Sequence, residues 1–229
     1  MRKVILPIIA LSIAIISCNK TPQGEAAKVS APQEAAAIDS AAAEYVVDNK
    51  VSNLTFVGSK KVGDNHSGII AIKEGKLAIE NNLLVGGSFV IDMANLTITD
   101  EGMPEEKKAK LAGHLAGPDF FDAPKHPTAT FQVTTVNPYM ADTANSSAKL
   151  DWATEAPTHT ITGNLIMRDS TRGITFPAKI VITDSKVTAD AKFMIDRTLW
   201  GINYQSESSL GNKIINKEVK IGVHLEATK

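Results

Sequence analysis

The chain has 229 residues, with 24 basic and 25 acidic side chains and a formal net charge of −1. This balance lacks the concentrated positive charge by which proteins hold nucleic acid, so no nucleic-acid partner is expected. A single cysteine excludes an intramolecular disulfide bond.

The first residues have the composition of an export signal. Arg2 and Lys3 precede an apolar run of 13 residues, Val4–Ile16, which is short for a membrane-spanning helix. The run leads into the tetrapeptide IISC, which resembles a bacterial lipobox. We therefore expect a lipoprotein signal peptide over residues 1–17 and lipid attachment at Cys18. The alternatives are a cleaved secretory signal with an incidental cysteine, or an uncleaved anchor.

The next segment, residues 18–44, is rich in Ala, Pro, Gln, Glu and Ser and has no aromatic side chain. Such a composition buries too little apolar surface to fold, which predicts a flexible tether. The alternative is an Ala-rich helix around Glu34–Glu44. Asn19 and Lys20 do not form an acidic run after the cysteine, which favours a protein that faces the periplasm. The choice between inner and outer membrane stays open.

Residues 45–229 are enough for one domain with a sizeable core. Apolar and polar residues alternate through most of it, for example along Phe89–Met93, Ile174–Ile182 and Val187–Ile195. This alternation indicates strands with one buried face, and turn signals such as Asp184-Ser185 separate them. Many strands of this kind predict an all-β antiparallel sandwich or barrel.

One predicted helix interrupts the strands. Pro104 suits a first turn, two acidic residues follow it, and Gly117 with Pro118 ends the helix. The helix leads into a loop with two adjacent aromatic residues, Phe120 and Phe121. We therefore expect the helix and this loop to close one end of the sheet together.

Large and small residues share the inward face of the predicted sheet. Five phenylalanines fall on five different strands in phase with the apolar side, and Gly and Ala residues lie between them. Ala191 is one of these small residues, because Asp190 and Lys192 occupy the other face of its strand. Large rings among small residues suit a barrel that tapers or one that leaves an apolar cavity, and the residues leave both alternatives open.

Three segments resemble a known family. They are the loop Leu115–Phe131 (LAGPDFFDAPKHPTATF), the hairpin Gly163–Phe176 (GNLIMRDSTRGITF) and the turn-forming segment Phe193–Gly201 (FMIDRTLWG). Together and in this order they are similar to the YceI-like family of lipid/polyisoprenoid-binding proteins, over Tyr45–Thr228. The resemblance implies an eight-stranded antiparallel lipocalin-like barrel, with a short helix near one end and a cavity for a long isoprenoid chain. Residues 136–158 depart from the family pattern as an expanded loop.

The expected ligand contacts are mainly apolar side chains of the barrel interior. The predicted cavity residues are Phe56, Phe89, Ile91, Phe120, Phe121, Phe131, Phe176, Ala191, Phe193 and Trp200. For the adjacent pair Phe120 and Phe121, the alternative to ligand contact is a plug of the barrel end.

Three basic residues are candidates for contacts with a ligand headgroup: Lys125, His126 and Arg197. The planar fork of an arginine donates paired hydrogen bonds, which suits a diphosphate or a quinone. The alternatives are a turn capped by Asp122 with Lys125 and His126 in solvent, and stacking or an ion pair for Arg197 beside Trp200.

No set of residues predicts catalysis or a metal site. The sequence has no nucleophile elbow, paired-cysteine motif or phosphate-binding loop, and its 5 histidines are scattered. We therefore expect neither an enzyme nor a cofactor. The predicted function is a membrane-anchored envelope lipoprotein that carries or stores a long-chain isoprenoid lipid of polyprenyl or quinone type. The alternative is an interaction protein with a packed barrel core, whose rim loops bind a protein partner that the sequence does not name.

Overall fold

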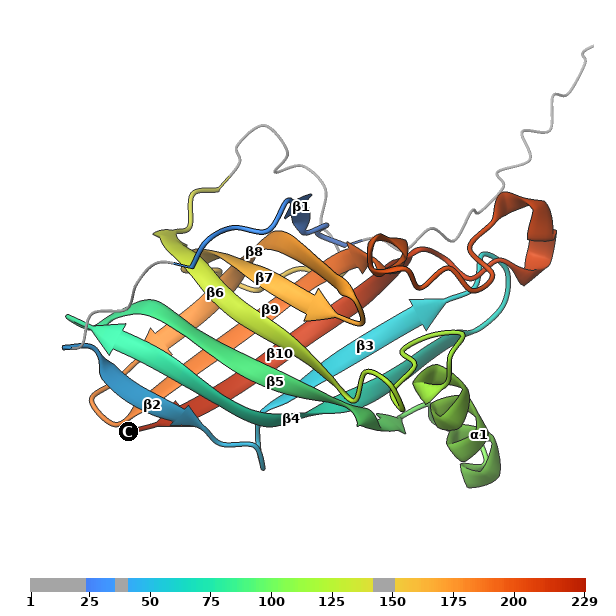
Figure 1. Ribbon diagram of the computed structural model, residues 1–229, viewed down its shortest axis with the longest axis horizontal. Helices are drawn as coiled ribbons and strands as arrows, with labels where there is room; N and C mark the ends of the chain where they lie inside the picture. Colours follow the sequence, from blue (N-terminus) through green and yellow to red (C-terminus); the bar gives the residue numbers. More distant parts are fainter. Residues whose placement is uncertain (1–23, 36–40, 142–150) are drawn as a thin grey trace, which may run out of the picture.

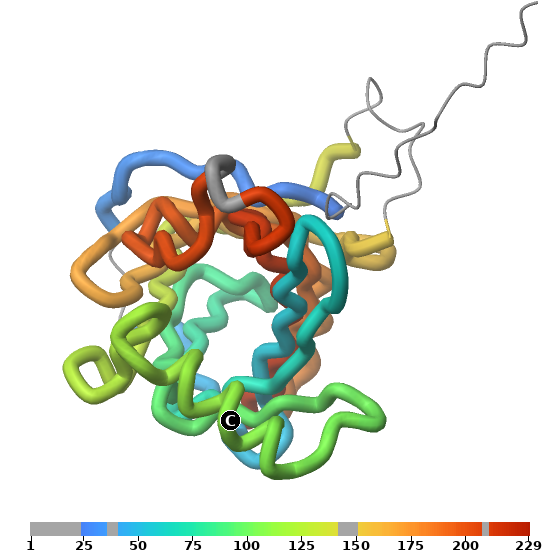
Figure 2. The backbone as a smooth tube through the Cα atoms, turned by 90° about the vertical axis from the view of Figure 1, so that its right-hand side faces the viewer, coloured from blue at the N-terminus to red at the C-terminus, as the bar shows by residue number. Residues whose placement is uncertain are grey.

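The computed structural model describes residues 24–35, 41–141 and 151–229, with the side chains of residues 208–210 left out. The predicted signal peptide, Cys18 and most of the predicted tether therefore lie outside the described residues. Within them the chain forms a closed antiparallel barrel with eight strand positions, which confirms the predicted fold class (Figure 1). Figure 2 looks at the barrel from the end where the helix lies and shows the strands around a central axis.

Seven strands each supply one position of the wall, and two shorter strands share the eighth. The seven are β4 (Asn65–Glu80), β5 (Leu83–Ile98), β6 (Thr128–Pro138), β7 (His159–Met167), β8 (Ser170–Ile182), β9 (Lys186–Asp196) and β10 (Glu218–Thr228). Neighbours in this order pair antiparallel. β3 (Asn53–Ser59) pairs with both β4 and β10 and closes the barrel, and β2 (Ala43–Val47) continues the same position toward one end.

The period-two pattern of the sequence matches the barrel wall. Along β5, Phe89, Ile91 and Met93 are buried and their neighbours are more exposed, because alternate side chains of a strand point to opposite faces. The pairing of β4 with β5 shifts register between Ile70 and Ile72 and again between Ala78 and Ile79. Such irregularities increase twist and bend a strand, which helps a long pair to curve around a barrel.

The helix α1 (Glu105–Ala116) begins directly after Pro104, and Gly117 caps its end, as predicted. It lies beside β5 at one end of the barrel (Figure 1). Two 3-10 helices, η1 (Arg197–Trp200) and η2 (Ser208–Lys213), follow β9 and precede β10. In the described part of the chain, no helix is long and apolar enough to span a membrane.

β8 and β9 pair only near their connecting turn, from Ile182↔Val187 to Lys179↔Asp190. Continued further, the same register would place Pro177 opposite Lys192. Proline has no N–H to donate to a ladder, so this position favours an opening between the strands. The hydroxyl of Thr154 bridges it, since it accepts a hydrogen bond from Lys192 N at 2.9 Å and donates one to Pro177 O at 2.8 Å.

An N-terminal segment fills the rest of this opening. β1 (Lys28–Ser30) pairs antiparallel with Gly173–Thr175 of β8, and Ala26 forms a bridge with Met194 of β9. The flexible tether expected over residues 18–44 is thus corrected at Lys28–Ser30 and at Ala43 and Glu44, which pair with the barrel as β1 and the start of β2. Two unpaired strand edges offer N–H and C=O groups that the backbone of any sequence can satisfy, so composition alone does not predict this pairing.

The expanded loop expected over residues 136–158 is also closer to the barrel than predicted. β6 continues to Pro138, which pairs with His159, and Tyr139 N donates to Thr158 O at 2.9 Å. Trp152 lies on the outer surface, where its Nε1 donates to Ile221 O at 2.9 Å. The middle of the loop, residues 142–150, lies outside the described residues.

Candidate ligand-binding cavity

The interior of the barrel is not filled by its side chains. It holds a cavity of about 220 Å³, the space that the centre of a water-sized sphere can reach. On this measure a single water needs about 10–15 Å³. All eight wall positions contribute side chains, and almost every atom that faces the cavity is carbon. Such a wall offers water no hydrogen-bond partners, so the space suits an apolar ligand.

Glycines allow two of the large rings to lie flat against the wall. A Cβ atom at Gly68 would stand 2.4 Å from the ring of Phe56, and one at Gly163 would stand 2.4 Å from the ring of Phe131. No real Cβ contact is that short, so any other residue would displace these rings. The cavity therefore remains open because glycines share the inward face with the phenylalanines.

Four of the phenylalanine rings, including that of Phe131, form a continuous series across neighbouring strands. Ring centroids are 5.5 Å apart for Phe89 and Phe131, and 5.6 Å apart for Phe131 and Phe176. Phe176 and Phe193 are stacked at 4.1 Å. These contacts fix the rings against one another and give one side of the cavity a rigid aromatic surface.

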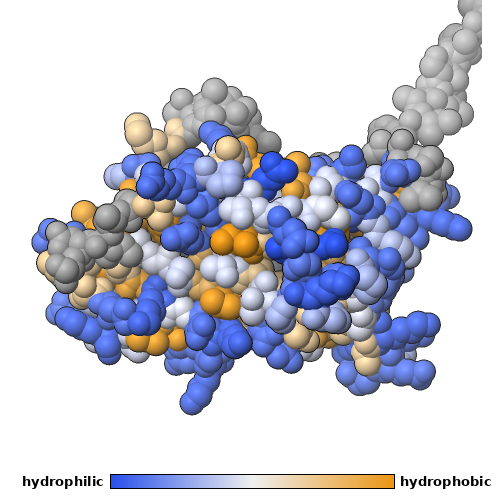
Figure 3. Space-filling view, viewed as in Figure 1, coloured by the Kyte–Doolittle hydropathy of each residue, from blue (hydrophilic) through white to orange (hydrophobic). Residues whose placement is uncertain are grey.

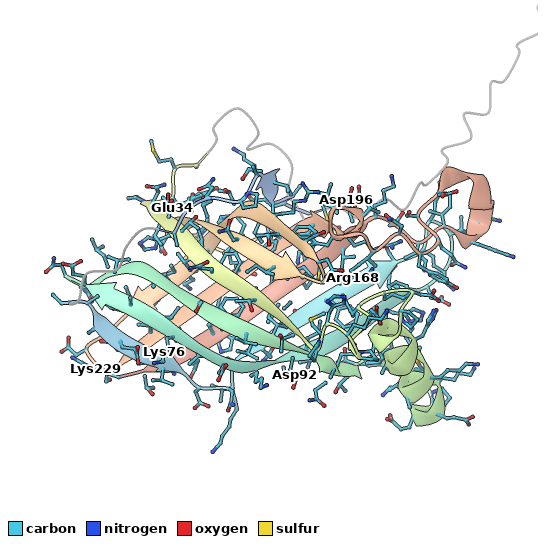
Figure 4. All side chains as sticks on the ribbon, viewed as in Figure 1. Glu34, Lys76, Asp92, Arg168, Asp196 and Lys229 are labelled. Carbon is cyan, nitrogen blue, oxygen red and sulfur yellow. The ribbon has the colours of Figure 1, made fainter. Side chains whose placement is uncertain are left out.

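One end of the barrel is closed by packing. The hydroxyl of Tyr45 donates toward the backbone oxygens of Thr183 and Asp184 in the turn between β8 and β9, at 3.2 and 3.0 Å. Val187 and Ala227 are fully buried at the same end. Figure 4 labels Lys76 and Lys229 at this end, away from α1.

The opposite end is the mouth of the cavity. Leu111 and Leu115 of α1 line it, together with Phe120 and Phe121 from the following loop. Helix and loop thus lie together at one end, as expected, but they narrow the opening and do not close it. The polar residues that line it are Ser59, Lys60, Asp64, His66 and Arg197. Lys60 and Asp64 are exposed, so this end connects the apolar interior with solvent.

The loop after α1, which contains Phe120 and Phe121, is held in place by hydrogen bonds of its own backbone. Asp122 adopts a left-handed conformation with φ 48°, donates its N–H to Gly117 O at 2.8 Å and accepts from His126 N at 2.8 Å. This turn places the ring of Phe120 edge-on to His114, with centroids 5.2 Å apart. Phe120 is buried, whereas Phe121 is partly exposed at the mouth.

All predicted cavity residues except Trp200 line the cavity. Trp200 is fully buried, but its indole Nε1 donates to Leu165 O at 3.1 Å. Trp200 belongs to η1, which follows the end of β9 at Asp196. Hence the strand alternation that directs side chains inward does not extend to Trp200. Its expected place on the cavity wall is therefore corrected.

Two of the three expected headgroup residues do not line the cavity. Lys125 is exposed and pairs with Asp122 at 3.0 Å, as the alternative of a capped turn predicts. His126 lies 3.6 Å from Asp169 of the β7–β8 turn. Both point away from the interior because the turn at Asp122 directs the phenylalanines inward instead.

Arg197 lines the mouth, but its guanidinium is occupied. The group donates to four backbone oxygens, those of Asn216 at 3.1 Å, Ile202 at 2.6 Å, Tyr204 at 2.8 Å and Ile215 at 3.1 Å. Only 4% of the residue is exposed, and burial lowers the pKa of its guanidinium below the ordinary value. Arg197 thus ties together the segments around η1 and η2 and leaves few donors for a ligand.

The outer surface contrasts with this interior. The face shown in Figure 3 is largely hydrophilic, with apolar side chains scattered among polar ones. In the described part of the chain, no cluster of three or more His, Cys, Asp or Glu side chains could hold a metal ion. The apolar cavity is therefore the candidate site for a small molecule.

A closed antiparallel barrel around an apolar cavity with a polar mouth defines a class of proteins that hold one small ligand. The chain belongs to the YceI-like family, because the model of the YceI-like domain matches residues 45–227. This confirms the resemblance seen in the sequence. Among curated proteins, none matches.

Two solved structures share the fold. BcnA of Burkholderia cenocepacia is 22% identical, with a TM-score of 0.56 over 80% of this chain and 99% of that one. A polyisoprenoid binding domain from Saccharophagus degradans, described as implicated in plant cell wall breakdown, is 14% identical, with a TM-score of 0.53 over 80% and 97%. At such identities the likeness shows the fold.

Proposed function

We propose that this protein binds a long-chain isoprenoid lipid inside its barrel and carries or stores it in the cell envelope. The cavity carries this proposal, since a carbon-lined interior with most of its polar residues at the mouth suits a hydrocarbon chain with a polar head. The neighbour from Saccharophagus degradans is named for polyisoprenoid binding, which agrees with such a ligand. A polyprenyl or a quinone lipid has the required form.

The free energy of burial is sufficient. Transfer of about 400 Å² of isoprenoid surface from water yields about 10 kcal/mol at about 25 cal/mol per Å². Lost freedom on association costs at least about 4 kcal/mol. The balance corresponds to roughly micromolar to millimolar affinity before any headgroup contact.

The proposal includes a membrane anchor on Cys18 and a position facing the periplasm. Since Ala26 is bridged to β9, the chain meets the barrel wall only eight residues after Cys18. At about 3.5 Å per residue this stretch reaches at most about 28 Å. Phase separation in detergent tests the anchor: wild-type protein is expected with the detergent, and the Cys18→Ser variant in the aqueous phase. Wild-type protein in the aqueous phase would refute the anchor.

Binding, rather than catalysis, is the proposed activity, with no cofactor besides the lipid. The rival function, an interaction protein with a packed barrel core, is disfavoured because the core encloses the cavity. The bound molecule is identified by mass spectrometry of an organic extract of the purified protein. A series of species that differ by isoprene units is the expected result.

Substitution of Ala191 tests whether the cavity holds this lipid. Ala191 lines the cavity from β9, and Lys192 beside it is exposed on the outer face. Ala191→Trp should fill the cavity, leave the ligand-free protein as stable as wild type or more so, and remove lipid from the extract. Lys192→Trp is the control and should keep its lipid. A destabilised Ala191→Trp protein that still contains the lipid contradicts the cavity route.

A further inference from the structure

His66 is a cavity-mouth residue that the sequence analysis did not single out. It pairs with Gly58 across β3 and β4, two positions before Gly68, which pairs with Phe56. Since side chains on the same face recur every second residue, His66 belongs to the inward row of β4. Its side chain is 29% exposed and lines the mouth, where the ligand headgroup of the proposed function would lie.

Asp100 holds this histidine in one orientation. Asp100 Oδ2 lies 2.7 Å from His66 Nδ1. The other carboxylate oxygen accepts from Ser67 N at 2.7 Å and from Ser67 Oγ at 2.8 Å. A carboxylate can only accept, so Nδ1 carries the proton and Nε2 is the ring nitrogen left for another partner. Among the described residues, none forms a hydrogen bond with Nε2.

The charges around the mouth are unfavourable for an anionic headgroup. Asp64 and Asp100 are carboxylates near His66, and the guanidinium of Arg197 is bound to backbone oxygens. Lys60 is the only other cation that lines the mouth in the described chain. Proteins usually hold diphosphates with several Arg or Lys donors, and one flexible lysine beside two carboxylates does not supply them.

We propose that His66, positioned by Asp100, hydrogen-bonds the headgroup of the bound lipid, and that this headgroup is a neutral hydroxyl or carbonyl oxygen rather than a diphosphate. The inference rests on the proposed function of lipid binding and specifies its ligand. With a neutral ring, Nε2 accepts from a hydroxyl. With a protonated ring, paired to the carboxylate of Asp100, it donates to a carbonyl.

Binding of four probes to the purified protein, measured by isothermal titration calorimetry, tests this inference. The probes are geranylgeraniol, geranylgeranyl diphosphate, a quinone with a side chain of the same length, and the parent hydrocarbon without a headgroup. We expect the alcohol or the quinone to bind more tightly than the diphosphate. His66→Leu should weaken the preferred neutral probe about tenfold and leave the hydrocarbon unchanged, because one hydrogen bond is lost.

His224→Leu is the matched control. His224 Nδ1 also lies 2.7 Å from a carboxylate, that of Asp190. Asp190 lines the cavity, but His224 does not. The control variant should bind every probe as wild type does. Tighter binding of the diphosphate, or equal affinities of wild type and His66→Leu for the preferred neutral probe, overturns the inference while lipid binding stands. Failure of all four probes to bind instead refutes the proposed function itself.

Discussion

Asn164 holds the backbone of Gln33 by two hydrogen bonds. Its Nδ2 donates to Gln33 O at 2.7 Å, and its Oδ1 accepts from Gln33 N at 2.9 Å. The side chain of Asn164 thereby imitates a neighbouring strand, and the residue is buried, with 7% exposed. Together with β1 on β8, this pair fastens the N-terminal segment to the barrel wall.

Loss of this pair should loosen the N-terminal segment. Asn164→Ala removes both hydrogen bonds, and we expect the free energy of unfolding to fall by about 1–2 kcal/mol. Hydrogen exchange should become faster at the amides of Ala27 and Met194, which are bonded across the same opening. Asn137→Ala, at an exposed position of β6, serves as the control. Unchanged exchange at Ala27 in Asn164→Ala would show that Asn164 does not hold the segment.

A methyl group at Gly163 should be far more harmful than one at Gly58. The Cβ at position 163 would overlap the ring of Phe131 and stand 2.5 Å from Gln132 O. Gly58→Ala places its Cβ in open space on the same cavity wall. Denaturant unfolding should show a loss of about 2 kcal/mol or more for Gly163→Ala and little change for Gly58→Ala. Equal stability of the two variants would contradict the flat packing of the Phe131 ring.

Removal of the Arg197 guanidinium should destabilise the mouth strongly. Arg197→Met leaves four backbone oxygens without their donor, and buried groups left unsatisfied cost about 1–3 kcal/mol each. Three of the four bonds are only partly buried, so we expect a total loss of about 3 kcal/mol in denaturant unfolding. Arg172→Met loses one exposed bond to Leu199 O and should cost less than about 1 kcal/mol. Similar losses for both would rule out a structural role specific to Arg197.

Stability should depend on the charge of Asp100. Burial raises the pKa of this carboxyl, but hydrogen bonds from His66 and Ser67 outweigh burial and lower it below the ordinary value of 3.8. A lowered pKa in the folded state means that the carboxylate stabilises the fold above the unfolded value. This contribution disappears as pH falls through the folded value.

Comparison with Asp100→Asn isolates this contribution. Wild type should be the more stable protein at neutral pH, and the difference should shrink as pH falls below about 4. Chemical denaturation at a series of pH values measures it. The control is Asp92→Asn, which removes a half-buried carboxylate near the same end of the barrel that accepts from Ala94 N and Asn95 Nδ2 (Figure 4). A difference that grows on acidification would reverse the assigned sign of the pKa shift.

The amino-acid sequence by itself determined which residues face inward. The alternation along β5, β8 and β9 assigned Phe89, Phe176 and Ala191 to the interior, because the period of a strand is a local property. The ends of α1 could be predicted for the same reason, since Pro104 and Gly117 restrict the backbone directly beside them. The family resemblance added the barrel.

The tertiary structure decided whether the interior was full. Cavity volume depends on the radius of the barrel and on ring orientations, and the contact of Phe131 with Gly163 joins residues of two strands. The roles of Arg197 and His66 could not be predicted from the sequence either. One hydrogen-bond partner of Arg197 is Asn216, 19 residues later in the chain. Asp100, which orients His66, lies 34 residues after it. The strand formed by Lys28–Ser30 depends on an opening that Pro177 creates about 150 residues later in the chain. Periodicity reports the faces of a strand, whereas register, closure and the space that remains inside arise only when distant strands meet.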